Sequence, residues 1–163
     1  MNYDDSRGEI AVREASFPED AATVSSLLED YLRQTEAEKA EHGFGATEAE
    51  LPERYARQVA DPAAAFRGMR VLVGSVDDVD CGMVALSSTN GSSEVKRFWT
   101  TPLARSRGVG SALIDAALGG AARPVRLSVW EWREPAIRLY RRLGFVDAVS
   151  WDDRGGLLCL ELP

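Results

Sequence analysis

A short run rich in arginine and glycine carries the clearest chemical signal in this chain. It reads Arg105-Ser106-Arg107-Gly108-Val109-Gly110-Ser111 and lies between a predicted strand and a strongly periodic predicted helix. The N-terminus of a helix exposes unpaired N–H groups and a partial positive charge, both of which favour phosphate. Glycine lets the backbone approach a ligand without a Cβ, and arginine adds charge-assisted hydrogen bonds. The run therefore predicts a binding site for phosphate groups.

Two common nucleotide-binding motifs fit this run poorly. The P-loop ends in Gly-Lys-Ser/Thr, which the run lacks. The dinucleotide fingerprint has a third glycine where Leu113 stands. An unrelated nucleotide-binding domain is therefore the weakest of the functions considered for this chain.

The elements that must position the run follow from hydrophobic periodicity. Alternation predicts strands at residues 9–15, 69–74, 82–87, 94–100, 125–129, 145–150 and 157–162. Steps of three and four residues predict helices from about residue 20 to Ala40, from Val109 to the Gly119-Gly120 pair, and from Ala136 to Leu143. This order predicts one mixed α/β domain over residues 1–163, without the regular alternation of a doubly wound fold.

Polar residues predict where helices begin and where strands turn. Ser16 and Glu19 are expected to form a capping box for the first helix. The segment 47–50 offers a similar cap for a short second helix that ends near Ala60, although Pro52 disfavours helix at the residue before it. A turn is expected at 77–80 and a polar loop at 87–93.

The arginine and glycine run also resembles the signature of the GCN5-related N-acetyltransferase (GNAT) superfamily. In that signature Arg or Gln, two residues, Gly, one residue, and then Gly or Ala wrap the pyrophosphate of coenzyme A; here the positions are Arg105, Gly108 and Gly110. Residues 94–102 and 135–145 are similar to the family's segments before and after the signature. The resemblance implies the GNAT acyl-CoA N-acyltransferase fold, a mostly antiparallel sheet with two splayed parallel strands and about four flanking helices.

The resemblance implies acetyl-CoA as a co-substrate and no metal. Backbone groups of Phe98, Trp99 and Thr100 would pair with the pantetheine arm, and N–H groups from Arg107 to Ser111 would bind the pyrophosphate. Many family members carry Asn where Arg133 stands, so this arginine either contacts a phosphate of the cofactor or lies on the surface. The full set of implied cofactor-binding residues is Phe98, Trp99, Thr100, Arg105, Ser106, Arg107, Gly108, Val109, Gly110, Ser111 and Arg133.

Two residues are candidates for proton transfer. Tyr140 matches the tyrosine that lies near the CoA sulfur in many GNAT enzymes, and it would protonate the leaving thiolate; its spacing also suits the apolar face of its helix. Glu94 is the candidate base, acting directly or through water, or else a solvated carboxylate at a strand end. Its rivals come from the acidic first half of the chain and are Glu29, Glu41 and Glu50.

Other side chains have both a structural and a functional interpretation. His42 could titrate near the acceptor site or simply be exposed in a glycine-flanked loop. Trp130 and Trp132 could form the wall of a pocket or pack in the core. Cys81 and Cys159 stand far apart and form no CxxC pair, so two reduced, packed thiols are expected rather than a disulfide framework or a zinc site.

Charge and hydropathy narrow the partners. The formal net charge of -7 disfavours nucleic acid and anionic membranes. Arginine gathers in the second half and acidic residues in the first 61, which would suit a cationic acceptor or merely keep the surface soluble. The N-terminus resembles no secretory signal and no stretch is long and apolar enough to span a bilayer, so a cytoplasmic protein is expected.

The expected function is transfer of acetyl from acetyl-CoA to a primary amine by direct attack in a ternary complex. The amine would belong to a small molecule, a peptide or a protein. The alternative is a catalytically weak GNAT-like module that binds CoA for regulation. A homodimer is left open, and the sequence does not identify the amine.

Overall fold

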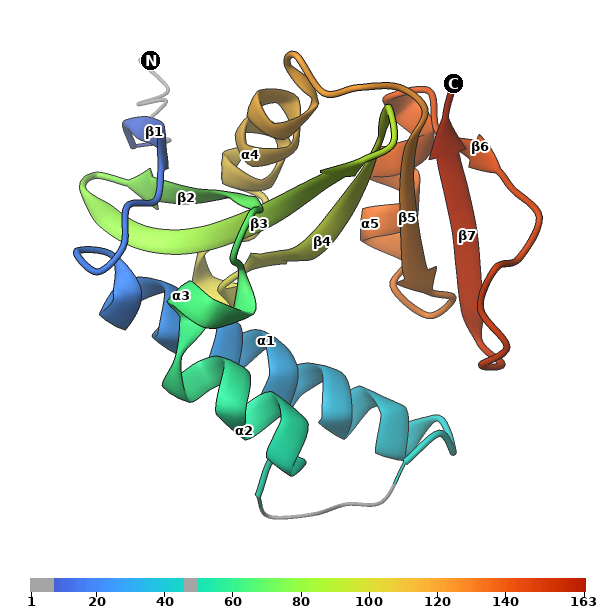
Figure 1. Ribbon diagram of the computed structural model, residues 1–163, viewed down its shortest axis with the longest axis horizontal. Helices are drawn as coiled ribbons and strands as arrows, with labels where there is room; N and C mark the ends of the chain where they lie inside the picture. Colours follow the sequence, from blue (N-terminus) through green and yellow to red (C-terminus); the bar gives the residue numbers. More distant parts are fainter. Residues whose placement is uncertain (1–7, 46–49) are drawn as a thin grey trace, which may run out of the picture.

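The computed structural model describes residues 8–45 and 50–163, which build one seven-stranded sheet (Figure 1). The order along the sheet is β1-β2-β3-β4-β5-β7-β6. The β4–β5 pair is parallel and the other five neighbouring pairs are antiparallel, which confirms the predicted mixed, mostly antiparallel sheet. The strands are β1 (Ile10–Glu14), β2 (Arg70–Val76), β3 (Val79–Thr89), β4 (Ser92–Thr100), β5 (Val125–Trp130), β6 (Val146–Asp147) and β7 (Leu157–Leu162).

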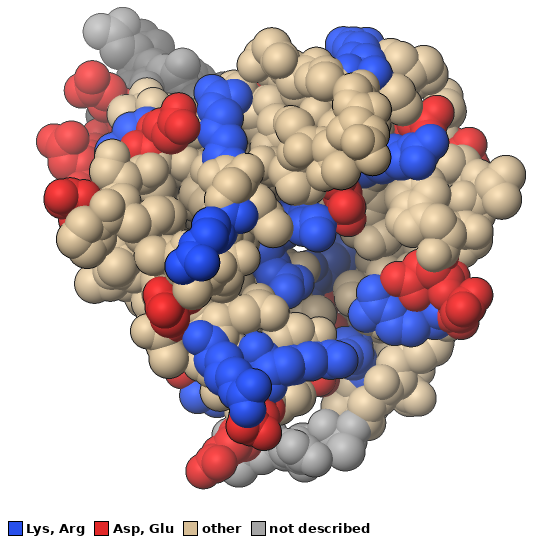
Figure 2. Space-filling view, in the orientation of Figure 1, with Lys and Arg blue, Asp and Glu red and all other residues tan. Residues whose placement is uncertain are grey.

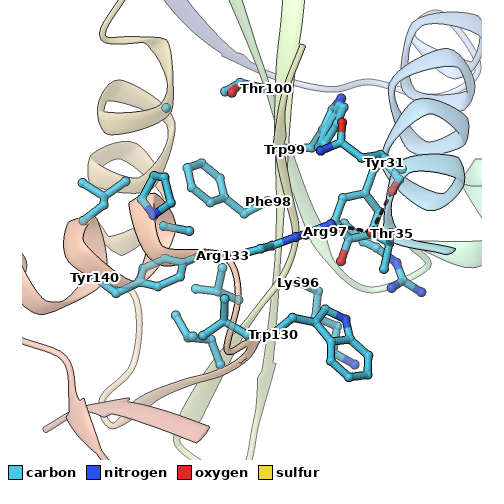
Figure 3. A pocket seen from close by; sticks show the side chains of 18 of the residues that line it. Tyr31, Thr35, Lys96, Arg97, Phe98, Trp99, Thr100, Trp130, Arg133 and Tyr140 are labelled. Carbon is cyan, nitrogen blue, oxygen red and sulfur yellow. Dashed lines mark hydrogen bonds between the residues drawn. The ribbon is translucent and has the colours of Figure 1, made fainter. Parts of the chain in front are cut away.

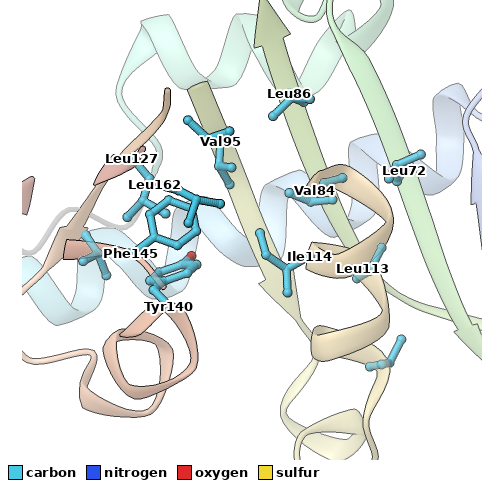
Figure 4. Packing of buried hydrophobic residues seen from close by; sticks show 14 of the residues in the cluster. Leu72, Val84, Leu86, Val95, Leu113, Ile114, Leu127, Tyr140, Phe145 and Leu162 are labelled. Carbon is cyan, nitrogen blue, oxygen red and sulfur yellow. The ribbon is translucent and has the colours of Figure 1, made fainter. Parts of the chain in front are cut away.

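Helices cover both faces of this sheet (Figure 1). On one face Leu28 and Leu32 of α1 pack against Met83 of β3 in one buried cluster. On the other face Leu113 and Ile114 of α4 pack against β2 and β3 in a second cluster, which Tyr140 of α5 joins (Figure 4). The helices are α1 (Ala21–Glu41), α2 (Glu53–Ala60), α3 (Pro62–Ala65), the short 3-10 turn η1 (Pro102–Ala104), α4 (Val109–Leu118) and α5 (Glu134–Arg142).

The predicted capping box of the first helix is wrong. The helix begins at Ala21 behind Asp20, and no side chain caps it. The Asp20 carboxylate accepts from the backbone N–H of Ser16 at 2.9 Å and from Arg13 at 2.9 Å. Asp20 therefore holds the turn before the helix, the role that sequence alone gave to Ser16 and Glu19.

The second helix ends at Ala60 as predicted. Most of the proposed cap at 47–50 lies outside the described residues, and α2 begins at Glu53 directly behind Pro52. Proline suits this position because its fixed φ is compatible with a helix start. The one-turn helix α3, which follows Asp61, was not predicted; the Asp61 side chain accepts from the Ala64 N–H at 3.1 Å.

Both central hairpins turn more tightly than the sequence analysis expected. Asp77 and Asp78, with φ of 49° and 64°, form a two-residue turn between β2 and β3. Asn90 and Gly91, with φ of 51° and 78°, do the same between β3 and β4, so the predicted loop at 87–93 is mostly strand. Positive φ at both positions gives a turn whose twist matches that of the strands, and Asn-Gly is its strongest signal. The closing hairpin is confirmed, although its first strand is only β6, two residues long.

The two parallel strands separate soon after they meet. They pair through Ser93 with Val125 and Glu94 with Arg126, and through no later residues. Beyond this point β4 bulges, because Lys96 and Trp99 pair with Ala85 and Met83 of β3, and Arg97 takes a positive φ of 54°. A bulge bends its strand, and here it turns β4 away from β5.

Candidate functional site

The separation of β4 and β5 opens a cavity of about 670 Å³ at the middle of the sheet (Figure 3). Figure 2 shows a hollow near the middle of this face, bordered by Lys and Arg side chains. The walls come from α1, α2, β4, β5, the turn before α4, the loop after β5, and α5. A cavity of this size suits a small-molecule ligand.

The phosphate-binding run forms the turn that starts α4. Gly108 precedes the helix with a φ of 96°, which only glycine adopts at low cost. The first bond into the helix runs from the Ala112 N–H to the Gly108 carbonyl at 3.1 Å, so the preceding N–H groups have no acceptor within the helix. Gly108, Gly110 and Ser111 all line the cavity. The predicted anion site is therefore a free helix N-terminus beside the cavity.

The Arg105 side chain is held between α1 and the end of β4. Its guanidinium donates to the Thr100 carbonyl at 3.3 Å and to Gln34 of α1 at 3.2 Å, and it lies 4.8 Å from the centre of the Trp99 ring. Desolvation in this position lowers the pKa of Arg105. Ser106 and Arg107 are exposed, and the roles of all three in binding a phosphate stay predictions.

Tyr140 packs in the core and also lines the cavity. Its ring lies 6.0 Å from Phe98 and 5.6 Å from Phe145, centre to centre, and the residue is 5 % exposed (Figures 3 and 4). Burial raises the pKa of the phenol. Among the described residues its hydroxyl has no hydrogen-bond partner, so the hydroxyl contributes no internal bond to stability. The two interpretations of Tyr140 from the sequence are therefore compatible.

Glu94 lies where β4 and β5 are still paired, at one end of the cavity. Its side chain is 46 % exposed and makes an ion pair with Lys96 at 3.7 Å. Among its rivals, Glu29 pairs with Arg33 at 2.7 Å, and neither Glu29, Glu41 nor Glu50 lines the cavity. Proton removal by Glu94 stays a prediction.

A polar link that was not predicted from the sequence joins α1 to the start of α5 across the cavity. Arg133 donates to Glu38 at 2.9 Å and to Thr35 at 2.8 Å. We call Thr35, Glu38 and Arg133 the clasp. Arg133 is not a surface residue, because its side chain is only 18 % exposed. Partial burial opposes ionisation of Glu38, but hydrogen bonds from Gln34 and Trp132 and the charge of Arg133 together lower its pKa.

Stacked aromatic rings next to Glu38 form a second contact between the end of α1 and the residues at the end of β5. The His42 ring stacks on Trp132 at 4.1 Å between centres, and Trp132 stacks on Trp130 at 4.8 Å. His42 Nδ1 also lies 2.8 Å from the Glu38 carbonyl, so this exposed histidine ends α1 instead of standing free in a loop. Both tryptophans line the cavity, as one of their two interpretations expected.

The comparisons with known proteins agree with this geometry. Residues 67–147, from just before β2 to β6, match the acetyltransferase (GNAT) domain family. By this match the chain contains a GNAT acetyltransferase domain. The matched stretch contains the splayed strands, the glycine turn and Tyr140, so the resemblance drawn from the sequence is confirmed.

Solved structures share the GNAT fold over nearly the whole chain. YncA of Salmonella typhimurium, solved with its cofactor acetyl-CoA, superposes with a TM-score of 0.67 at 17% identity, covering 94% of this chain and 92% of YncA. Spermidine N-acetyltransferase of Vibrio cholerae, solved with CoA and spermine, gives 0.65 at 16% identity, covering 94% of each chain. At these identities the likeness extends to the fold alone.

A relative with higher sequence identity matches a shorter part of this chain. An IAA acetyltransferase of Azospirillum brasilense is 33% identical over 73 residues, which is 42% of this chain. The match spans 48% of that relative, about half of its length.

Groups outside the cavity add little chemistry to this GNAT domain. Cys81 and Cys159 are buried free thiols, as expected, and burial raises the pKa of Cys81. In the part of the chain that the structure describes, no cluster of three or more His, Cys, Asp or Glu is arranged to hold a metal ion. Among the same residues, no helix is long and apolar enough to cross a membrane.

Removing the arginine of the clasp should destabilise the fold. Arg133→Ala leaves the Glu38 carboxylate half-buried without its cation, and we expect a loss of about 1–3 kcal/mol in the free energy of unfolding. Urea denaturation measures this loss. The matched control is Arg138→Ala, since the Arg138 side chain on the same helix is 61% exposed and its pair with Glu134 is 3.9 Å long. Equal losses in both variants would contradict a stabilising clasp.

The clasp should also be visible in the pH dependence of stability. The folded-state pKa of Glu38 lies below its ordinary value of 4.5, so its contribution is fully present above that value. The contribution is lost as the pH falls through the lowered, folded-state pKa. Arg133→Ala should therefore flatten the acid side of the stability profile.

Proposed function

We propose that this chain is an N-acetyltransferase that moves the acetyl group of acetyl-CoA to a primary amine by direct attack in a ternary complex. One observation carries the proposal. A single cavity joins the free N-terminus of α4, the unpaired edges of β4 and β5, and Tyr140. These are the parts needed to hold a phosphate group, an extended arm and a reacting thioester in one space.

The residues present fit acetyl-CoA as a substrate. The N–H groups from Arg107 to Ser111 would bind the pyrophosphate. The first three N–H groups of α4, those of Val109, Gly110 and Ser111, donate to no acceptor within the helix. At Gly110 an added Cβ would lie 3.4 Å from Phe98, an ordinary van der Waals contact, so this position accepts the Gly or Ala of the family signature. Beyond Glu94 no β5 residue pairs with β4, which leaves main-chain groups of Phe98, Trp99 and Thr100 facing the cavity for the pantetheine arm.

The reaction then needs three roles at the thioester. The neutral amine nitrogen attacks the carbonyl carbon, an N–H donor on the splayed part of β4 stabilises the oxyanion, and the C–S bond breaks as the amide forms. The Tyr140 hydroxyl gives its proton to the leaving thiolate, and the phenolate regains a proton from solvent after the base has released the amine proton there. The raised pKa of Tyr140 keeps the phenol protonated until this step. Glu94 is the candidate that accepts the amine proton, directly or through water.

The test combines binding and turnover. We expect acetyl-CoA to raise the melting temperature while ATP and NAD leave it unchanged, and we expect free-thiol release from acetyl-CoA that depends on an added primary amine. Thermal shift and a thiol-reactive dye measure these effects with a mixed amine panel. Binding without turnover would favour the CoA-binding module over the enzyme. A folded protein that does neither would overturn both.

A further inference from the structure

The cavity is cationic although the chain as a whole is acidic. The formal net charge of the chain is -7. Fields of distant surface charges are screened within about 8 Å at physiological salt, so the lining decides what the cavity attracts. That lining has two glutamates, Glu38 and Glu94, against seven basic residues: Lys39, Lys96, Arg97, Arg105, Arg133, Arg142 and Arg154.

Four of these seven cations are neutralised by an acidic neighbour. The pairs are Lys39 with Glu36, Lys96 with Glu94, Arg133 with Glu38 and Arg154 with Asp152. Arg97, Arg105 and Arg142 have no acidic partner among the residues that the structure describes. Arg105 is held by Gln34 of α1, the Thr100 carbonyl and the Trp99 ring, and Arg142 lies on α5, on the α4 side of the sheet. Arg97 and Arg105 are therefore the unneutralised cations on the α1 side, and Arg97 keeps more of its donors open because it makes one hydrogen bond where Arg105 makes two.

The fold holds Arg97 in a defined place. Its backbone sits in the bulge of β4 with a φ of 54°, and its guanidinium carbon lies 5.7 Å from the ring centre of Tyr31 and 5.8 Å from that of Tyr55. One hydrogen bond, 3.1 Å to Gln58 on α2, uses a single donor of the five that a guanidinium carries. Figure 3 shows Arg97 beside Tyr31 and Thr35, across β4 from Phe98 and Tyr140.

We propose that the acceptor amine carries a carboxylate and that Arg97 binds it. This inference rests on the proposed function and names its substrate class. A planar guanidinium with open donors matches a carboxylate in charge and shape. A phosphate dianion would need a second cation with open donors. The other cations on this side either have an acidic partner or, in the case of Arg105, already donate to Gln34 and the Thr100 carbonyl. The acceptor is therefore an amino acid or a similar amino carboxylate, in contrast to the cationic acceptor that the acidic first half of the chain could suit.

The experiment compares acceptors that differ in one group. Free amino acids, their carboxamides and the matching decarboxylated amines are assayed with acetyl-CoA, with O-phosphoethanolamine and spermidine beside them. We expect kcat/KM for a preferred amino acid to exceed that of its carboxamide by about ten- to a hundredfold, the value of a charged hydrogen bond. Arg97→Gln should remove this preference, so that kcat/KM becomes similar for the acid and its carboxamide, and Arg97→Lys should restore part of it.

The control is Arg57→Gln, which removes the same charge from α2 outside the cavity, where the Arg57 side chain is 76% exposed. It should leave the preference unchanged. Equal or better use of carboxamides or spermidine, preference for the phosphate monoester, or equal effects of the two glutamine variants would overturn the assignment.

A binding measurement keeps this inference separate from the proposed function. Calorimetry of amino acids and their carboxamides against the protein saturated with CoA reports the carboxylate preference without turnover. Should acetyl-CoA support no transfer at all, the acetyltransferase proposal fails, while tighter binding of the acid than of the amide, lost in Arg97→Gln, would still support the carboxylate site. Equal binding of acid and amide would overturn it.

Discussion

Replacing Gly108 by glutamate should weaken acetyl-CoA binding by about two orders of magnitude or more, because it puts a negative charge where the pyrophosphate is proposed to bind. The backbone φ at Gly108 is 96°, and an added Cβ would lie 3.2 Å from the Ile10 side chain. A residue other than glycine in this conformation costs roughly 1–2 kcal/mol in stability, so the protein should remain folded. Calorimetric titration with acetyl-CoA measures the effect.

A second glycine provides the matched control for this prediction. Gly120 has a φ of 75°, follows the far end of α4, and leaves nothing within 4 Å of an added Cβ. Gly120→Glu therefore introduces a comparable backbone strain and the same charge away from the cavity. Similar acetyl-CoA affinity in the two variants would show that the turn at Gly108 does not bind the phosphates.

Removing only the hydroxyl of Tyr140 should lower kcat by about a hundredfold or more, the usual contribution of a positioned acid. Acetyl-CoA affinity and thermal stability should change little in Tyr140→Phe, since the ring keeps its packing against Phe98 and Phe145 and the hydroxyl has no described partner to lose. Single-turnover thiol release and calorimetry measure the two quantities.

The raised pKa of Tyr140 determines how kcat should depend on pH. The phenol stays protonated beyond its ordinary value of 10.0, so wild-type kcat should show no alkaline decline from Tyr140 below that pH. Tyr140→Ala provides a contrast, because removing the buried ring should also cost about 3–5 kcal/mol in stability. An unchanged kcat in Tyr140→Phe would assign the tyrosine to packing alone.

Local patterns were enough to predict most of the fold. Strands and helices leave a periodic pattern because residues close in the sequence decide the local backbone geometry. Such patterns are seen at residues 69–74 and 82–87 and after Val109. The Asn90-Gly91 turn was also present in the sequence as a known hairpin signal, and it was overlooked in favour of a longer loop. The capping-box prediction was wrong because Asp20, which accepts from Ser16 and Arg13, holds the turn before the helix. Arg13 also pairs with Asp80 of β3, a contact between residues far apart in the sequence.

The α1 side of the cavity is built by contacts between residues far apart in the sequence, which the sequence alone does not show. Glu38 and Arg133 are 95 residues apart, and nothing local to either residue indicates the other. A partial signal existed in α1, where Tyr31, Thr35 and Glu38 recur at steps of four and three and so share one helix face. The acidity of the first half does not by itself describe the cavity, because Glu36 and Glu38 are neutralised by cations in the folded chain.

The split in the sheet has a mechanical consequence. Strands β1 to β4 form one stiff plate and β5 to β7 another, and the seam between them is only two residue pairs long. Along the rest of the gap no peptide ladder joins them; the clasp and the stacked rings instead connect the second plate to α1, which packs on the first. Such connections yield at lower force than a continuous ladder, so the spacing of the plates can adjust to what lies between them while each plate keeps its shape.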